Sequence, residues 1–340
     1  MNARSLYFVE PGVVECRDRE LESVTAGMVR VETRWSAISA GTEGLVYRGE
    51  APESLDTDGP VPTLTDDLSF PLTYGYAAVG TVVETGDNVG DSLLGELVFA
   101  YNPHETAFVV HADEIVPVPD SIPSRKAPLL ANTETAVNFL LDGQPVLGER
   151  VAVFGLGVVG LLTTGLLSEF PLECVVAVDP VDRRREIARK FGADATIDPG
   201  EGDVETLFER HTPGRPDLVY ELSGDPSALN DAMSVTGYDG RIVVGSWYGI
   251  KPALLEFGGR FHRHRIDIES SQVGTIAPRH EGRWSRQRRH DQAWHWLEKL
   301  PAESLVTHEI PFERAPEAYR LLEHNPGEAV QVLLTYDESP

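Results

Sequence analysis

The chain has 340 residues, of which 41% are hydrophobic and 8% aromatic, so it can form a sizeable core split over about two domains. This composition excludes a disordered or fibrous chain. Asp and Glu number 54 against 29 Lys and Arg, which gives a formal net charge of -25. Because such a field repels phosphate backbones and anionic headgroups, we expect no binding to nucleic acid or to a membrane surface.

Arginine supplies most of the positive charge. Lysine occurs only at four positions, Lys126, Lys190, Lys251 and Lys299. An acidic, lysine-poor surface is typical of salt-adapted cytosolic proteins, so we expect a halophilic protein of haloarchaeal origin. The alternative is an acidic enzyme from a mesophile.

Cys16 and Cys174 are the only cysteines, too few for a disulfide framework or a multi-cysteine zinc site. Met1–Glu10 has no apolar run behind a basic start, so no signal peptide is expected. The longest uncharged apolar run, Val151–Leu167, is slightly short for a membrane span and is interrupted by glycines, which favours a buried strand followed by a helix. We therefore expect a soluble protein of the cytoplasm.

The first third of the chain is predicted to be rich in β-strands. Short segments containing Val, Phe and Thr are separated by Gly, Pro and Asp turns, at Met28–Thr33, Ala78–Val83, Glu96–Ala100 and Thr106–Val110. Residues 50–70, with three prolines and several Asp, predict a surface loop. The prolines at 117, 119 and 123 predict a crossing between domains.

From about Ala131 strands and helices alternate. Helices are predicted over 158–168 and 183–191, and strands over Val151–Phe154, Val175–Val178, Leu218–Glu221, Arg241–Val244 and Ile266–Glu269. This alternation predicts βαβ units in a doubly wound parallel sheet. After Val273 the pattern becomes irregular, with helices over Gln292–Leu300 and Ala315–His324 and a closing strand over Val330–Thr335.

The first strand of this sheet leads into a GxGxxG motif. Gly155 permits the tight turn, Gly157 lets the backbone approach a pyrophosphate at the helix N-terminus, and Gly160 allows close helix–strand packing. Asp179 ends the next strand, which completes the dinucleotide-binding context. A glycine-rich turn without a ligand is the alternative. The remaining residues of the motif are also expected to contact the cofactor: Leu156, Val158 and Val159.

The carboxylate of Asp179 favours NAD, because it can accept hydrogen bonds from ribose hydroxyls and repels a 2′-phosphate. Arg183, Arg184 and Arg185 make NADP possible, since a guanidinium there could reach that phosphate; we include Arg184 in the cofactor site. The alternative is that these arginines form a solvated helix face. Further loops at C-terminal strand ends are expected to line the nicotinamide pocket through Ser223, Gly245 and Ser246.

A glycine-rich turn in mid-chain behind an N-terminal β domain resembles the medium-chain dehydrogenase/reductase superfamily. Residues 36–43, SAISAGTE, are similar to its GxCGTD segment, and residues 72–77, LTYGYA, occupy the place of its GHE motif. Residues 74–80, 132–138, 246–249 and 270–274 resemble the bacteriochlorophyllide dehydrogenase branch. The resemblance implies a β-rich GroES-like catalytic domain over 1–125 and 273–340 and a Rossmann domain over 126–272. It also implies that Thr135 packs on the nicotinamide.

The sequence departs from this family at its zinc ligands. The family uses a Cys, a His and a third Cys, Asp or Glu, whereas the matching positions here hold Ser39, Tyr76 and Ala131. A hydroxyl, a phenol and a methyl group do not hold zinc at neutral pH, so we predict no zinc. Glu134 lies near the third position but has no His or Cys partner, and we assign it to the substrate pocket.

Without a metal, oriented hydrogen-bond donors would have to stabilise the substrate oxygen. Tyr76 and Ser39 take the vacated position, and Thr42 matches the hydroxyl residue that relays the alcohol proton in the family. The relay histidine is replaced by Leu45, and His104 is a candidate acid or base. Alternatively, Tyr76 fills space, Ser39 and Thr42 cap a turn, and His104 is solvated. The resemblance suggests that the next residue, Glu43, braces the loop.

Basic residues concentrate between 260 and 290 in an otherwise acidic chain, namely Arg260, Arg263, Arg265, Arg279, Arg283, Arg286, Arg288, Arg289, His262, His264, His280 and His290. They could bind an anionic substrate, with Arg260 and Arg263 facing it, or form an acid-paired face or a subunit interface. Trp247 and Tyr248 could stack on a planar substrate or wall the pocket.

These features predict a zinc-independent, NAD(P)-dependent oxidoreductase. It would transfer a hydride between nicotinamide and a small carbonyl/alcohol substrate in a cleft between two domains, as a homodimer or homotetramer. The alternatives are a quinone/enoyl-type C=C reductase and an NAD(P)H-binding protein without turnover.

Overall fold

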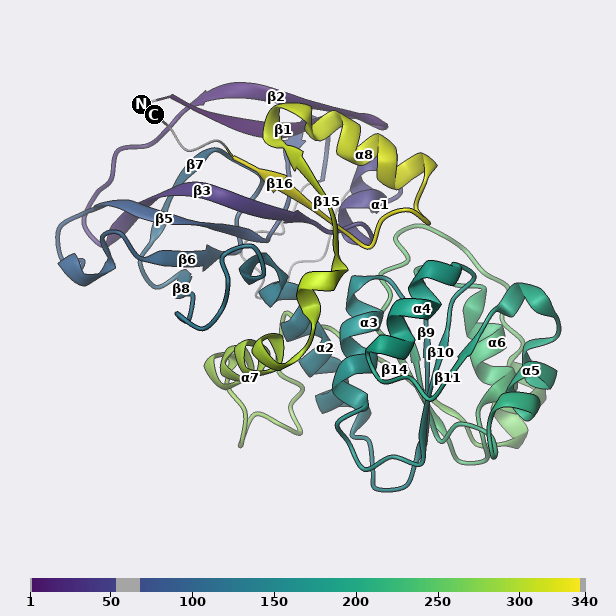
Figure 1. Cartoon of the computed structure of the whole chain (residues 1–340). Helices are drawn as coiled ribbons and strands as arrows, with labels where there is room; N and C mark the ends of the chain where they lie inside the picture. The colour runs from purple at the N-terminus through teal and green to yellow at the C-terminus, as the bar shows by residue number, and fades with distance from the viewer. Residues whose placement is uncertain (1, 53–67, 337–340) are drawn as a thin grey trace. The chain divides into compact units, whose positions relative to one another are not determined.

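The computed structural model describes residues 2–52 and 68–336, which form two compact units (Figure 1). The first unit comprises the described residues up to Ala131 and from Ala302 onward, and the second comprises Asn132–Pro301. The loop predicted over 50–70 falls largely on 53–67, outside the described residues.

The first unit is built from two sheets. A three-stranded sheet has the order β2-β1-β4, from β1 (Asn2–Glu10), β2 (Val13–Glu20) and β4 (Leu72–Thr73). A seven-stranded, mostly antiparallel sheet has the order β15-β16-β3-β5-β6-β8, with β7 paired to β3. Its strands are β3 (Met28–Ile38), β5 (Ala78–Thr85), β6 (Leu97–Ala100), β7 (Ala107–His111), β8 (Ile115–Pro117), β15 (Val306–Pro311) and β16 (Gln331–Thr335).

Alternation along β3 positions the core of this unit. Val29 and Val31 point inward and pack with Val82 and Phe108. Glu32, the next residue along β3, points to the opposite face and is exposed. The predicted strands in this region correspond to β3, β5, β6 and β7. Helix α8 (Ala315–His324) contacts β2 and α1 (Thr42–Arg48), so this C-terminal helix lies against the segment that follows β3 (Figure 1).

The second unit is a doubly wound parallel sheet, as predicted. Its strand order is β11-β10-β9-β12-β13-β14, so the chain reverses direction across the sheet between β9 and β12. The strands are β9 (Arg150–Phe154), β10 (Cys174–Val178), β11 (Ala195–Ile197), β12 (Leu218–Glu221), β13 (Arg241–Val244) and β14 (Asp267–Ser270). The helices between them are α3 (Val158–Leu167), α4 (Asp182–Lys190), α5 (Val204–His211) and α6 (Ala228–Val235).

Continuous apolar runs explain the central strands of this sheet. Every residue of β10 is buried, because α3 and α4 contact it and its neighbours.

Within the ranges that the structure describes, no helix has both the length and the apolarity needed to cross a bilayer.

The predicted domain bounds differ from the two units at two places. Residues 126–131, predicted in the Rossmann domain, lie in the first unit, and residues 273–301, predicted in the catalytic domain, lie in the second. Residues 273–301 join the second unit through helix α7 (Arg286–Lys299), whose buried Arg289 hydrogen-bonds Glu134 and Asn138 of helix α2 (Leu130–Gly143). Helix α7 also begins before the predicted residue 292, because the Ser285 side chain accepts the Arg288 N–H and caps it.

Candidate active site

The glycine-rich turn has steric reasons for its glycines. Gly155 has φ +88° and a Cβ there would collide with the backbone of Ser223, while a Cβ at Gly160 would collide with the Gly155 carbonyl. Gly157 caps α3, and no heavy atom of the described residues lies within 4 Å of the place where its Cβ would be. The N-terminus of α3 therefore stays open to an anion such as a pyrophosphate.

Asp179 lies against this turn. Its side chain is buried, Oδ2 accepts the Leu156 N–H at 2.8 Å, and Oδ1 accepts the Val181 N–H at 2.8 Å. Each carboxylate oxygen keeps further acceptor capacity for ribose hydroxyls. The Arg184 guanidinium lies 3.7 Å from Oδ2, which partly offsets the charge that would repel a 2′-phosphate. These residues fit an adenosine ribose.

Arg185, in contrast, is structural. Its guanidinium donates to the Asp179 carbonyl at 2.8 Å and pairs with Asp198 at 3.0 Å. It is buried, so neither a solvated face nor a direct role with a phosphate describes it.

The loops after β12 and β13 are joined by a buried carboxylate. Glu221 accepts the Ser223 N–H at 2.8 Å and also the hydroxyls of Ser223 and Tyr248. Burial, followed by the charge of Glu221, raises the pKa of Tyr248. The Gly224 N–H donates to Ser246 Oγ at 2.9 Å. The hydroxyl of Tyr248 thus braces the pocket wall, which favours that alternative over stacking on a substrate.

Gly245 and Thr135 are also placed by the second unit. A Cβ at Gly245 would collide with the Phe139 ring, so the β13 loop can approach α2 closely only with glycine there. Thr135 lies within α2, half-buried, rather than opening that helix. Trp247 is half-buried in the segment between Gly245 and Tyr248.

In the first unit, three hydroxyl groups come together. The Tyr76 hydroxyl donates to Ser39 Oγ at 2.5 Å and lies 3.4 Å from Thr42 Oγ1. Ser39 follows β3, Thr42 opens α1, and Tyr76 precedes β5, and all three are half-buried. Burial raises the pKa of Tyr76 and the two hydrogen bonds lower it only partly. At neutral pH this hydroxyl cluster (Ser39, Thr42 and Tyr76) therefore contains a protonated phenol.

Behind the cluster lies the fully buried carboxylate of Glu43. It accepts hydrogen bonds from the Ser39 N–H at 2.8 Å and from the Tyr319 hydroxyl at 2.5 Å. It also lies 2.9 Å from His104 Nε2. Burial and Glu43 together raise the pKa of Tyr319 far above its usual value. Glu43 braces the loop as the resemblance suggested, but it does so through partners that sequence reasoning missed.

His104 is neither a solvated histidine nor a residue that a substrate can touch. Its side chain has 0% exposure, with Nε2 at Glu43 and Nδ1 2.7 Å from Ser36 Oγ. Ser36 Oγ lies 2.8 Å from the Tyr336 hydroxyl. Both ring nitrogens of His104 therefore have hydrogen-bond partners within the first unit. The prediction of His104 as a direct acid or base is corrected to a buried support.

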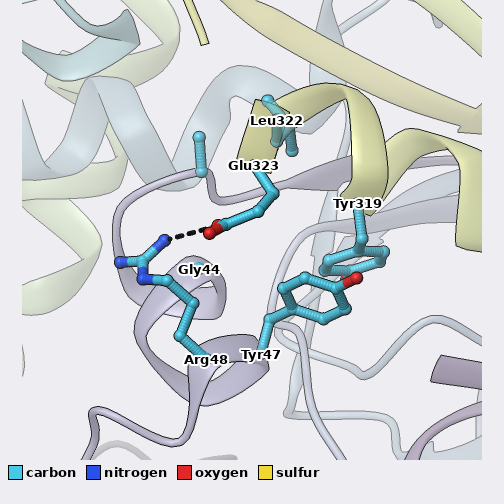
Figure 2. A pocket seen from close by; sticks show the side chains of 7 residues that line it. Gly44, Tyr47, Arg48, Tyr319, Leu322 and Glu323 are labelled. Atoms are coloured by element: carbon cyan, nitrogen blue, oxygen red, sulfur yellow. Dashed lines mark hydrogen bonds and ion pairs between the residues drawn. The ribbon is translucent and has the colours of Figure 1, made fainter. Parts of the chain in front are cut away.

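A small cavity adjoins this support (Figure 2). It lies between α1 and α8, and Figure 2 shows the Arg48–Glu323 ion pair, 3.3 Å long, across it. Tyr47 and Tyr319 form its floor, and its volume of about 10 Å³ holds at most one water. It is a packing seam rather than a substrate pocket.

The donor set does not fit zinc. Ser39 and Tyr76 offer a hydroxyl and a protonated phenol, and Ala131 offers no donor. Glu134 is engaged in the second unit by Arg289 at 2.9 Å and His290 at 3.2 Å. Among the described residues, no group of three or more His, Cys, Asp or Glu is arranged to hold a metal ion.

Arg260 is paired with acid. Its guanidinium lies 3.0 Å from Glu205 and 3.4 Å from His264. Arg265 pairs with Asp239 and Arg279 with Glu269 in the same way. The acid-paired alternative therefore describes these members of the basic segment, and Arg263 is exposed.

Comparisons with known proteins agree with this fold. Residues 158–287 match the family model described as "Zinc-binding dehydrogenase". The chain is 25% identical to the D-guloside 3-dehydrogenase of Escherichia coli (strain K12), over 98% of this chain and 100% of that protein. It is 28% identical to the (R,R)-butanediol dehydrogenase of Bacillus subtilis (strain 168), over 74% and 77% of the two proteins. An alcohol dehydrogenase structure from Escherichia coli CFT073, complexed with NADH, matches with a TM-score of 0.81 and 21% identity over 98% and 99% of the two chains.

The family model and these relatives agree with the resemblance of the sequence motifs to the medium-chain dehydrogenase/reductase superfamily. They confirm the predicted Rossmann-type α/β fold and the prediction of an alcohol dehydrogenase-like oxidoreductase. The family description points to zinc, whereas the residues at the matching positions are poor zinc ligands.

Proposed function

We propose that this alcohol dehydrogenase-like chain is a zinc-independent oxidoreductase that transfers a hydride between NAD(H) and a carbonyl/alcohol substrate. The observation that supports the proposal is the hydroxyl cluster, because it presents a protonated phenol at a position that the sequence resemblance matches to a zinc ligand of the family. A preorganised hydrogen-bond donor stabilises charge on a reacting oxygen without a metal.

The second unit would hold the cofactor. The open N-terminus of α3 would face the pyrophosphate, and Asp179 would accept hydrogen bonds from the adenosine ribose. When bound, the nicotinamide supplies the hydride donor or acceptor. The charge of Asp179 favours NAD, and Arg184 beside it keeps NADP as a weaker second cofactor.

The hydroxyl cluster would handle the substrate oxygen. Tyr76 donates to Ser39, which leaves the Ser39 proton free to point at a further acceptor such as a substrate carbonyl. In reduction the substrate oxygen would take a proton from the cluster as the hydride arrives, and the cluster would recover a proton from water. In oxidation both proton transfers would run in reverse. Glu43 holds Ser39 through its backbone N–H, so the donor stays oriented during the reaction.

The substrate class follows from the hydroxyl donors and from the relatives. A cluster of neutral hydroxyls suits an uncharged oxygen substrate, and the similar proteins are named for a D-guloside and for a butanediol. We therefore propose a secondary alcohol with a neighbouring hydroxyl group, or the matching ketone.

A turnover assay on metal-stripped protein tests the proposal. The protein is treated with chelator, its zinc content is measured, and NADH formation is followed with secondary alcohols and polyols at high salt. We expect turnover that zinc addition does not increase. Turnover only with activated enones would favour a C=C reductase, and tight NADH binding without any turnover would favour a binding protein.

The charge of -25 supports a further proposal, a salt-adapted protein of a salt-rich cytoplasm. Because salt screens the repulsion among the acidic side chains, the melting temperature should rise with potassium chloride. A melting temperature that is flat or falls with salt would contradict it.

A further inference from the structure

A second buried polar cluster lies in the second unit. At its centre is Arg289 of α7, a guanidinium with only 2% exposure. Its Nε donates to Glu134 Oε1 at 2.9 Å, and its Nη1 donates to Asn138 Oδ1 at 2.8 Å. Both partners are buried residues of α2.

The same guanidinium also holds a loop. Its Nη2 donates to the Val273 carbonyl at 2.6 Å and its Nη1 to the Thr275 carbonyl at 3.1 Å. At the near end of this loop, Ser271 Oγ donates to Asp142 Oδ2 of α2 at 2.5 Å. Residues 271–275, the loop after β14, are therefore joined to α2 directly at one end and through Arg289 of α7 at the other.

The position of this loop in the sheet indicates a role in cofactor binding. It leaves the carboxyl end of β14, and the Ser271 N–H donates to the Val244 carbonyl at the end of β13. In doubly wound sheets a dinucleotide lies across the carboxyl ends of the strands, one mononucleotide half on each side of the point where the strand order reverses. Asp179, directly after β10, marks the side that would hold the adenosine half, so β12, β13 and β14 would carry the nicotinamide half.

A buried ion pair is a poor device for stability, because desolvation offsets its attraction, and such pairs are better explained where they fix one arrangement. We propose that Arg289, paired with Glu134, is a positioning residue that holds the β14 loop in the conformation that receives the nicotinamide half of the cofactor. This inference rests on the proposed function. It also gives Glu134 a role that differs from the substrate contact predicted for it.

Binding of NADH compared with binding of ADP-ribose tests the inference, since ADP-ribose lacks the nicotinamide. The double variant Glu134→Gln, Arg289→Met is used because it leaves no unpaired buried carboxylate. We expect NADH binding to weaken about tenfold or more while ADP-ribose binding changes less than about twofold. Arg289→Lys, which keeps the charge but not the fork of donors, should weaken NADH binding to an intermediate extent.

Arg241 offers a matched control. It donates to both oxygens of Glu149 and to the carbonyls of Gly143 and Gln144, but it lies at the amino end of β13. Arg241→Met should leave the ratio of NADH to ADP-ribose affinity unchanged.

The outcomes separate the two proposals. If the unaltered protein binds neither compound, the proposed function fails. If it binds both and the Arg289 variants lose affinity for the two in equal proportion, or keep full NADH affinity, the positioning role is overturned while the proposed function stands. Should the double variant not fold, Arg289→Lys decides alone, and wild-type NADH affinity in that variant would overturn the inference.

Discussion

A buried glutamate supports the candidate site in each of the two units, Glu43 in the first and Glu134 in the second, and the two are held differently. Glu43 in the first unit is surrounded by a backbone N–H, a phenol and an imidazole. Glu134 in the second unit is paired with a guanidinium. The first arrangement orients hydroxyl groups, and the second fixes a loop. A buried carboxylate thus fixes neighbouring groups in both units. Glu43 would support proton transfer at the substrate oxygen, and Glu134 would support binding of the cofactor.

The largest effect on turnover is expected for a substitution of Glu43, and it separates the roles of the two glutamates. Glu43→Gln replaces a carboxylate, which only accepts hydrogen bonds, by an amide whose NH2 group donates them. At least one of the three present contacts of Glu43 is then lost, and Ser39 and Tyr76 lose their alignment. We expect kcat to fall about 100-fold, as small displacements of reacting groups do, with NADH affinity unchanged. The free energy of unfolding, measured in urea, should fall by about 1.5–3 kcal/mol.

The control for this variant is Glu15→Gln in the same unit. Glu15 forms an exposed ion pair with Arg17, so its loss should change stability by less than about 1 kcal/mol and leave kcat unchanged. If Glu43→Gln weakened NADH binding rather than turnover, the division of labour between the two glutamates would be wrong.

Alkaline pH should distinguish the units by their tyrosines. Burial raises the pKa of Tyr74, Tyr76, Tyr319 and Tyr336 in the first unit, but of only Tyr220 and Tyr248 in the second. The unfolded chain loses these protons near pH 10, before the folded chain does, so stability is complete below about pH 10 and falls above it. Each tyrosine contributes up to about 1.4 kcal/mol per pH unit.

Hydrogen exchange, corrected for its intrinsic pH dependence, measures this difference. Above pH 10 the strands of the first unit should lose protection before β9 and β10 do. Equal loss in both units, or stability that stays constant to pH 11, would contradict the assignment of these raised pKa values.

The smaller expected effect concerns the cofactor. Asp179→Ser removes a charged acceptor and its repulsion, so NADH affinity should fall about tenfold while NADPH affinity rises, because Arg184 then faces the 2′-phosphate. Asp182→Ser, at an exposed acid nearby, is the control and should change neither Kd. A preference for NADH that survives Asp179→Ser would remove Asp179 from cofactor selection.

The contrast between the units also appears in what the sequence could predict. Apolar runs located β9, β10, β12, β13 and β14 within about two residues, because buried parallel strands have a local signature. Strand β2 was missed because most of its residues, ECRDRE after two valines, are polar, as befits an edge strand. Strand β1 was missed although Leu6 and Phe8 alternate inward.

The candidate site divides in the same way. Local motifs identified Gly155, Asp179 and Tyr76. The partners Tyr319 and Arg289 lie 276 and 155 positions from the glutamates that they bind, so no local pattern could have found them. The imidazole of His104 makes it a candidate acid or base in the sequence, but only the fold shows that Glu43 and Ser36 enclose it.

The central claim is that a phenol in the hydroxyl cluster does the work at the substrate oxygen. Its direct test is the kcat of Tyr76→Phe against that of Tyr74→Phe, in chelator-treated protein with saturating NAD and alcohol. Tyr74 packs edge-on against Tyr76 at 6.5 Å and its buried hydroxyl has no hydrogen-bond partner among the described residues, so it is a matched control. We predict that Tyr76→Phe lowers kcat about 100-fold and Tyr74→Phe leaves it unchanged. Equal rates in the two variants, or activity that returns only with added zinc, would contradict the account.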